Sequence, residues 1–186
     1  MPATPRRARA LALALAGLGI TASTMSALPA TAATGGSTSD TASTTTTAKK
    51  TQKTARVSAK RRVANRVLTA RNIAMNQRGD AYAYGAAGPD RFDCSGLVKY
   101  SYSRAGLSVP RTSSAQAGQA RRIAKKDLRS GDLMFFYGSG GVYHAAMFLR
   151  WSRGHALMVH SPGSGQRVRV AVPWTSAWFA GTFRRA

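Results

Sequence analysis

The pattern of apolar residues C-terminal to residue 60 constrains the fold more than any other feature of the chain. Over residues 61–77, apolar residues recur at helical spacing and would form one face of a helix: Val63, Val67, Ala70 and Ala74, with Leu68, Ile73 and Met75 widening this face. After Gly131 the pattern changes to short apolar or alternating runs separated by Gly, Ser and Pro, which are typical of strands. Five strands are predicted: 133–137, 145–151, 156–160, 168–172 and 178–183. Helices followed by an antiparallel sheet indicate an α+β domain.

Two shorter helices are expected between the first helix and the sheet. Gly79 is placed to end the first helix, and a second helix is predicted over residues 94–104. Ser113 or Ser114 is expected to cap a third helix that runs through Ala120. All the predicted helices therefore precede the predicted strands.

The N-terminal third of the chain has a different composition. Residues 1–33 combine a basic start, an apolar run over 10–20 and small residues at the end, which predicts a secretory signal peptide. A membrane span needs about 20 unbroken apolar residues, so no membrane span is expected in the mature protein. Residues 34–60 are mostly Thr, Ser, Ala and Lys and cannot form a core, which predicts a disordered linker. Residues 61–186 remain as one folded domain.

The charge of the chain implies a negatively charged partner. Lys and Arg number 28 against 6 Asp and Glu, giving a formal net charge of +22. Such a balance fits nucleic acid, an anionic membrane surface or the phosphate-bearing polymers of a Gram-positive wall. Predicted export and the lack of an aromatic-and-basic RNA-binding motif argue against nucleic acid. Solubility and an Arg-rich composition account for part of the charge.

The only cysteine, Cys94, stands where a loop rich in Gly and Pro (85–89) gives way to the second predicted helix. It has no partner for an internal disulfide. A thiol in the first turn of a helix faces unpaired N–H groups and the positive end of the helix dipole, which favour the thiolate. The alternative is a small buried apolar residue, which is the commoner fate of a lone cysteine.

The three histidines are placed so that two of them can meet. His144 opens one predicted strand and His160 closes the next, so a hairpin turning about residues 152–154 makes them neighbours and leaves His155 near the turn. A catalytic thiolate needs a base and a third group that orients the base, and Cys94, His144 and His160 can supply this set. Each histidine is alternatively a half-buried structural residue or a metal ligand. The 50 residues between Cys94 and His144 disfavour a zinc site.

Several blocks of the chain resemble, in order, those of the NlpC-type cell-wall endopeptidases, a papain-like family. The block over 82–98 contains the Asp93-Cys94-Ser95-Gly96 motif. The further blocks are 110–116, 128–136, 144–149 and 158–162, and the resemblance extends over about 67–185. It implies a papain-like α+β fold in which the cysteine begins a helix that packs on an antiparallel sheet of about five strands.

The resemblance also implies an activity. Cys94 would be the nucleophile, His144 the general acid/base and His160 the residue that orients it. The protein would be a secreted, cell-wall-associated cysteine peptidase that cleaves peptidoglycan stem peptides. The bond that we expect it to cleave is the one between D-isoglutamate and the diamino acid. No metal or cofactor is implied. We expect the basic linker to hold the protein on anionic wall polymers.

Three residues beside the cysteine are implied to bind substrate. The hydroxyl of Tyr82 would support the oxyanion or the substrate, and Asp93 and Ser95 would hold the amino end of the stem peptide. From the residues alone, Tyr82 is equally a packed aromatic side chain and Asp93 equally a helix cap.

Two other functions fit the same sequence. One is an N-acetylmuramoyl-L-alanine amidase, and the other is a non-catalytic cationic protein that binds the wall, against which the intact Cys94, His144 and His160 argue. The chain also departs from the family pattern over 145–148, where Ala-Ala-Met-Phe replaces Val-Gly-Ile-Tyr. A long hairpin leaves His155 as an alternative third member, although its place near the turn favours His160.

Overall fold

A computed structural model describes residues 43–184, with side chains described from residue 52 onward. The predicted signal peptide and the start of the predicted linker lie outside these residues. Helix α1 (Ser43–Asn76) passes through residues 43–60, where we expected disorder. Every side chain over 52–58 is exposed, so this part indeed forms no core. The backbone is helical nonetheless, because this part continues the anchored turns of the same helix and so needs no nucleus of its own, and its Ala, Lys, Arg and Gln residues favour the helix. The domain boundaries themselves stay a prediction.

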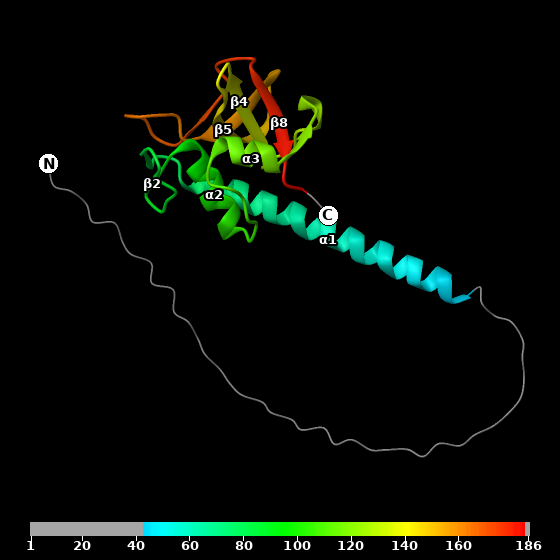
Figure 1. The fold of residues 1–186 in the computed structure, drawn as a ribbon. Coiled ribbons are helices and arrows are strands. Elements are labelled where there is room, and N and C mark those ends of the chain that lie inside the picture. The colour runs from blue at the N-terminus through cyan, green and yellow to red at the C-terminus, as the bar shows by residue number, and fades with distance from the viewer. Residues whose placement is uncertain (1–42, 185–186) are drawn as a thin grey trace, which may run out of the picture. The chain divides into compact units, whose positions relative to one another are not determined.

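Only the C-terminal part of α1 is anchored. Val67, Ala70 and Ala74 are fully buried, as their spacing predicted, and the N-terminal part runs out beyond the other elements (Figure 1). The helix is followed by Gly79 with φ +95°, a conformation that favours glycine. The other helices, α2 (Cys94–Arg104) and α3 (Ser113–Gln119), lie close to the prediction. The cap of α3 is wrong, however: Thr112, not Ser113 or Ser114, accepts from the N–H of Ala115.

The sheet contains the five predicted strands and one more, all antiparallel. The predicted ones are β4 (Leu133–Gly138), β5 (Gly141–Ser152), β6 (His155–His160), β7 (Arg169–Ala171) and β8 (Trp178–Thr182). The sixth, β3 (Arg121–Ile123), gives the order β3-β8-β4-β5-β6-β7. It follows α3, precedes the short 3-10 helix η1 (Lys125–Asp127), and carries no alternating pattern that could have revealed it. A parallel pair, β1 (Ala81–Tyr82) and β2 (Arg91–Phe92), closes the loop before α2.

The hairpin between β5 and β6 turns where the sequence predicted. Arg153 (φ 49°) and Gly154 (φ 78°) form a two-residue turn between the paired residues Ser152 and His155. Such a turn needs positive φ at both central positions and matches the twist of the strands. This turn sets the register next to it, and a β-bulge between Phe148 and Arg150 shifts that register by one residue. Turn and bulge together decide which residues meet at the other end of the hairpin.

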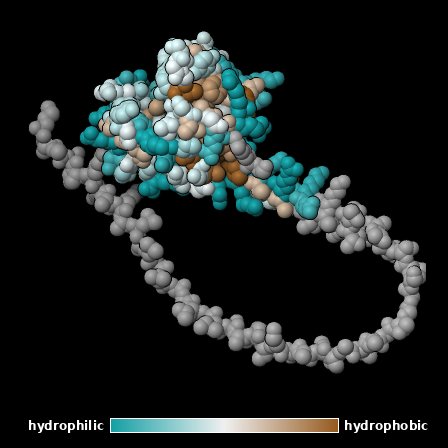
Figure 2. Space-filling model, viewed as in Figure 1, coloured by the Kyte–Doolittle hydropathy of each residue, from teal (hydrophilic) through white to brown (hydrophobic). Residues whose placement is uncertain are grey.

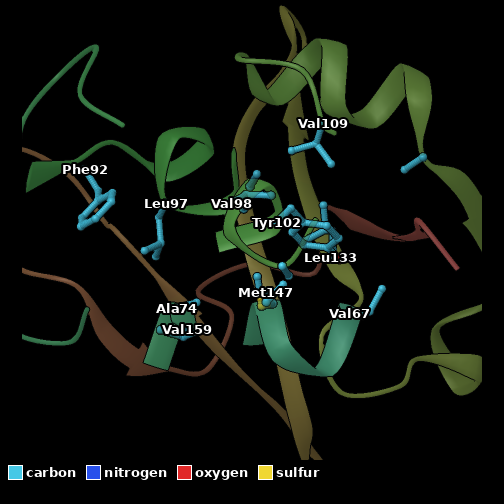
Figure 3. Close-up of a cluster of buried hydrophobic side chains, with 14 of the residues drawn as sticks. Val67, Ala74, Phe92, Leu97, Val98, Tyr102, Val109, Leu133, Met147 and Val159 are labelled. Carbon is cyan, nitrogen blue, oxygen red and sulfur yellow. The ribbon is translucent and has the colours of Figure 1, made fainter. Parts of the chain in front are cut away.

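The apolar residues form two clusters, one on each face of the sheet. The cluster between helices and sheet includes Val67 from α1, Val98 and Tyr102 from α2, and Leu133 and Met147 from the strands (Figure 3). The cluster on the opposite face is smaller, and its members are Leu128, Met134, Phe136, Ala146, Phe148, Ala156, Met158, Trp178 and Ala180. The alternation along β4 supplies both clusters, as expected of a central strand buried on both faces.

The fold is thus α+β, with helices on one side of an antiparallel sheet (Figure 1). Hydrophilic residues cover much of the face shown in Figure 2. Among the helices of residues 43–184, none has the length and apolar character needed to cross a membrane.

Candidate active site

Cys94 is the first residue of α2 and is held there by a cap. Asp93 has an extended backbone (φ −88°, ψ 179°), and its Oδ1 accepts a hydrogen bond of 2.6 Å from the N–H of Gly96. Asp93 is therefore the helix cap, one of the two roles that its sequence context left open. Gly96 is needed because a Cβ there would lie 2.0 Å from the carbonyl oxygen of Ala86. The cap and the crossing loop together fix the thiol at the helix start.

A guanidinium that the sequence analysis did not assign completes this arrangement. Arg111 forms a two-point salt bridge with Asp93: Nη1 lies 3.0 Å from Oδ1, and Nη2 contacts Oδ2. Its Nη1 also donates to the hydroxyl of Ser95 at 3.1 Å. Burial by itself raises the pKa of Asp93, but hydrogen bonds from Arg111 and Gly96 reverse this and bring it below its usual range. The sequence carried no signal for this pairing, because Arg111 lies 18 residues away on a different loop.

The thiol itself differs from the expectation of a stabilised thiolate. Burial raises the pKa of Cys94 above its ordinary value, and the nearby carboxylate of Asp93 raises it further. Backbone hydrogen bonds from Ala145 and Ser95 lower the pKa without outweighing burial. The free site therefore holds a neutral thiol. The hydrogen bond from Ala145 also places the sulfur against β5, at the residue that follows His144.

His144 and His160 meet as the predicted hairpin required. Nε2 of His144 lies 3.0 Å from Nδ1 of His160, and both side chains are buried. The register pairs Met147 with Val159, so residue 146 lies opposite His160. His144, two residues before 146, lies on the same face of the sheet and is therefore the diagonal neighbour of His160. His155 is exposed at the far end of the hairpin, opposite Ser152. The predicted proximity of His144 and His160 is confirmed.

Both imidazoles of the pair are held in the neutral form. Burial lowers the pKa of His144 to about 3, and the neighbouring His160 lowers it further. Burial likewise lowers the pKa of His160 to about 4, with a second contribution from the charge of Arg169. At neutral pH the pair can therefore accept a proton. Nε2 of His144 is engaged with His160, and Nδ1 is the ring nitrogen of His144 that does not take part in this contact.

An aromatic shell, which the sequence analysis did not identify, encloses the histidines. Trp174, in the loop between β7 and β8, stacks on His160 with ring centroids 5.6 Å apart and an interplanar angle of 24°. The same indole meets His144 edge-on at 5.1 Å and stacks on Phe136 at 4.4 Å. Nε2 of His160 is buried without a hydrogen-bond partner. No periodic pattern marked Trp174, since it lies in a loop and reaches the pair only through the fold.

A pocket of about 430 Å³ opens beside the cysteine. It is lined by Cys94, Tyr82 and Arg111, together with Asp93, Ser95, Thr112, Ser113, Val142, Tyr143, Tyr84 and Gly85. Burial raises the pKa of Tyr82, and the charges of Cys94 and Asp93 raise it further, which places this phenol beside the sulfur. All three sequence-predicted binding residues, Tyr82, Asp93 and Ser95, thus lie in one pocket with the thiol. Tyr84 and Tyr143 are additional lining residues without a prior sequence signal.

Other parts of the described chain lack comparable chemistry. Within residues 43–184, no group of three or more His, Cys, Asp or Glu side chains is arranged to hold a metal ion. A larger pocket of about 510 Å³ surrounds the salt bridge between Arg184 and Asp132, but its lining contains no cysteine. Neither His144 nor His160 lines this pocket or the one beside Cys94. The pocket beside Cys94 is therefore the candidate active site.

Comparisons with known proteins show what the chain is similar to. The model of the NlpC/P60 family matches residues 79–185. A probable endopeptidase of Corynebacterium glutamicum is 41% identical over 93 residues, which cover 50% of this chain and 42% of that protein. The chain thus spans less than half the length of that relative.

Solved structures share the fold at modest sequence identity. The peptidoglycan hydrolase RipB from Mycobacterium tuberculosis is 27% identical, with a TM-score of 0.56 and coverage of 64% of this chain and 65% of that one. RipD from the same organism, described as a non-catalytic domain adapted to peptidoglycan binding, is also 27% identical. Its TM-score is 0.52, with coverage of 63% of this chain and 97% of that one. Both hydrolysis and binding alone therefore occur on this fold.

Proposed function

This chain belongs to the NlpC/P60 family, and on that premise we propose that it is a secreted cysteine endopeptidase that cleaves peptidoglycan stem peptides. The bond is that between D-isoglutamate and the diamino acid. The observation that carries the proposal is the 3.0 Å contact between His144 and His160, beside a cysteine whose sulfur accepts from the N–H of Ala145.

The proposed reaction begins from neutral groups. His144 takes the thiol proton of Cys94 through Nδ1, and the sulfur attacks the γ-glutamyl carbonyl carbon as the proton leaves. His160 orients the base and accepts a hydrogen bond from the imidazolium that forms. The tetrahedral intermediate expels the amine of the diamino acid, which takes the proton from His144, and water then hydrolyses the thioester.

The environment of the thiol supports this order of events. A raised pKa of Cys94 and a lowered pKa of His144 both disfavour a permanent ion pair in the empty site. Charge then develops only during attack, when the backbone N–H of Cys94 at the helix start and the hydroxyl of Tyr82 are available to stabilise the oxyanion. Both carboxylate oxygens of Asp93 already accept hydrogen bonds, Oδ1 from Gly96 and Arg111 and Oδ2 from Arg111. A substrate amine that binds Asp93 would therefore share an oxygen with one of these donors.

Mass spectrometry of digested peptidoglycan tests the bond. Cleavage at the proposed bond exposes a new amine on the diamino acid, whereas an N-acetylmuramoyl-L-alanine amidase exposes it on alanine. Cys94→Ala should abolish hydrolysis while leaving wall binding unchanged, with Ser103→Ala, at an exposed position of the same helix, as a matched control that keeps both. Hydrolysis that persists in Cys94→Ala would refute the cysteine mechanism.

We further propose that the exposed part of α1 holds the protein on anionic wall polymers. Lys53, Arg56, Lys60, Arg61 and Arg62 are exposed. The helix contacts the rest of the domain at Ala64, whose carbonyl accepts from Arg184, and from residue 52 onward its first fully buried side chain is that of Val67. Attraction of this kind between exposed charges is screened by salt. Deletion of residues 49–62 should lower retention on purified wall, and added salt should release the intact protein; retention unaffected by either change contradicts this role.

A further inference from the structure

A third pocket lies on the face of the sheet opposite the helices and gathers all three tryptophans of the chain. It measures about 400 Å³ and is lined by Trp151, Trp174 and Trp178, together with residues of the β5–β6 turn and of the loop before β8. We call this pocket the tryptophan groove. Its volume is within the usual range of ligand sites, about 300–1000 Å³.

Two of the indoles are presented to solvent at a fixed angle. Trp151 is 43% exposed and packs on Phe148, with ring centroids 5.6 Å apart, while Trp174 is 54% exposed and stacks on Phe136. Trp178 is buried and forms the floor of the groove. Large apolar side chains held rigidly at a surface mark binding sites more often than they mark simple solvent exposure.

The groove is uncharged within a strongly basic protein. Its lining contains no Lys, Arg, Asp or Glu, although the chain has 28 basic residues. The nearby ammonium of Lys125 is already engaged, since it lies 3.9 Å from the ring centroid of Trp178 and donates to the carbonyl of Ser176. A phosphate polymer or an acidic peptide would find no partner here. The lining instead suits a neutral ligand that offers apolar faces to indoles and hydroxyls or amides to the polar rim.

We infer that the tryptophan groove binds the N-acetylhexosamine rings of the glycan strand. A β-linked pyranose presents a flat face of C–H groups that stacks on an indole, and its hydroxyl and acetamido groups reach the hydroxyls of Thr175 and Ser176 and the imidazole of His155. This inference rests on the proposed function, because the stem peptides that the protein would cleave are attached to glycan strands.

One side chain links the groove to the histidine pair. Trp174 lines the groove and also contacts His144 and His160. A glycan bound against one side of this indole therefore lies close to the histidine pair on its other side. Binding there would raise the local concentration of attached stem peptides at the cysteine, as linked sites do in general.

Chitotetraose, a soluble oligomer of N-acetylglucosamine, tests the inference on the full chain by tryptophan fluorescence and by calorimetry. We expect saturable binding that added salt leaves unchanged, and at least a tenfold loss of affinity in Trp151→Ala. Trp151→Phe should recover part of the affinity, which a general loss of folding would not allow. Arg150→Ala is the matched control, because it removes an exposed neighbouring side chain outside the groove.

Three results would overturn the inference. They are the absence of saturable binding, an affinity that Trp151→Ala does not change, and a salt-sensitive affinity that Arg150→Ala lowers as much as Trp151→Ala does. Concentration-dependent self-association that Trp151→Ala abolishes would also overturn it by assigning the groove to a second copy of the chain. Chitotetraose contains no peptide, so its binding is measured independently of stem-peptide cleavage, and either proposal can fail without the other.

Discussion

The buried histidine pair makes the stability of the fold depend on pH in a predictable direction. An unfolded chain binds a proton at each histidine with a pKa of about 6.5. In the folded protein the pKa falls to about 3 at His144 and to about 4 at His160 because of burial. The unfolded state therefore binds more protons below pH 6.5, and stability must fall as the pH falls from there toward 4.

The size of the effect follows from the same values. Each depressed histidine removes about 1.4 kcal/mol of unfolding free energy per pH unit within this window. Between pH 7 and pH 5 the loss integrates to about 2 kcal/mol per histidine, or about 4 kcal/mol for the pair. This loss is a large fraction of the free energy of unfolding of a typical domain, which is about 5–15 kcal/mol. Carboxylates contribute little here because they titrate near pH 4.

Urea unfolding followed by tryptophan fluorescence at pH 7, 6 and 5 measures this loss. His160→Gln should reduce the pH dependence by about half, whatever its effect on absolute stability, since only one depressed histidine remains. His155→Gln, at the exposed turn, should leave the dependence unchanged. Equal stability at pH 7 and pH 5 in the unmodified chain would show that the histidines are not held neutral, and would refute the reasoning.

Three further outcomes are expected. The rate of stem-peptide hydrolysis, normalised to the folded fraction, should stay constant from pH 7 to about 5.5, because the lowered pKa of His144 keeps the base neutral; a half-loss near pH 6.5 contradicts this. Gly96→Ala should destabilise the fold by about 2–3 kcal/mol in urea unfolding, because the new Cβ meets the oxygen of Ala86 at 2.0 Å; an unchanged midpoint contradicts the close packing. Arg111→Met should lower the free energy of unfolding by about 2 kcal/mol, because it leaves the carboxylate of Asp93 without its partner. Arg91→Met, at an exposed position, is the control, and equal losses in the two variants contradict a specific pair.

The sequence by itself determined the order of the helices and of five of the six strands of the main sheet, and it predicted that His144 and His160 lie close together. Val67, Ala70 and Ala74 specified the buried face of α1, and the alternation after Gly131 specified the strands, because both depend on local periodicity. The turn at Arg153 and Gly154 brought the two strands together, but a β-bulge between Phe148 and Arg150 was also needed to place His144 and His160 on one face. The periodicity of apolar residues and the residue preferences of a tight turn depend only on residues close together in the chain, so both can be predicted from the sequence.

The tertiary structure alone decided the electrostatic state of the site and its surroundings. The N-terminal position of Cys94 in α2 was predictable, but the raised pKa of its thiol depends on burial against β5. The partners Arg111 and Trp174 come from loops that only the assembled sheet and helices bring to Asp93 and the histidines. Burial and long-range pairing are properties of the packed chain, and no local pattern encodes them.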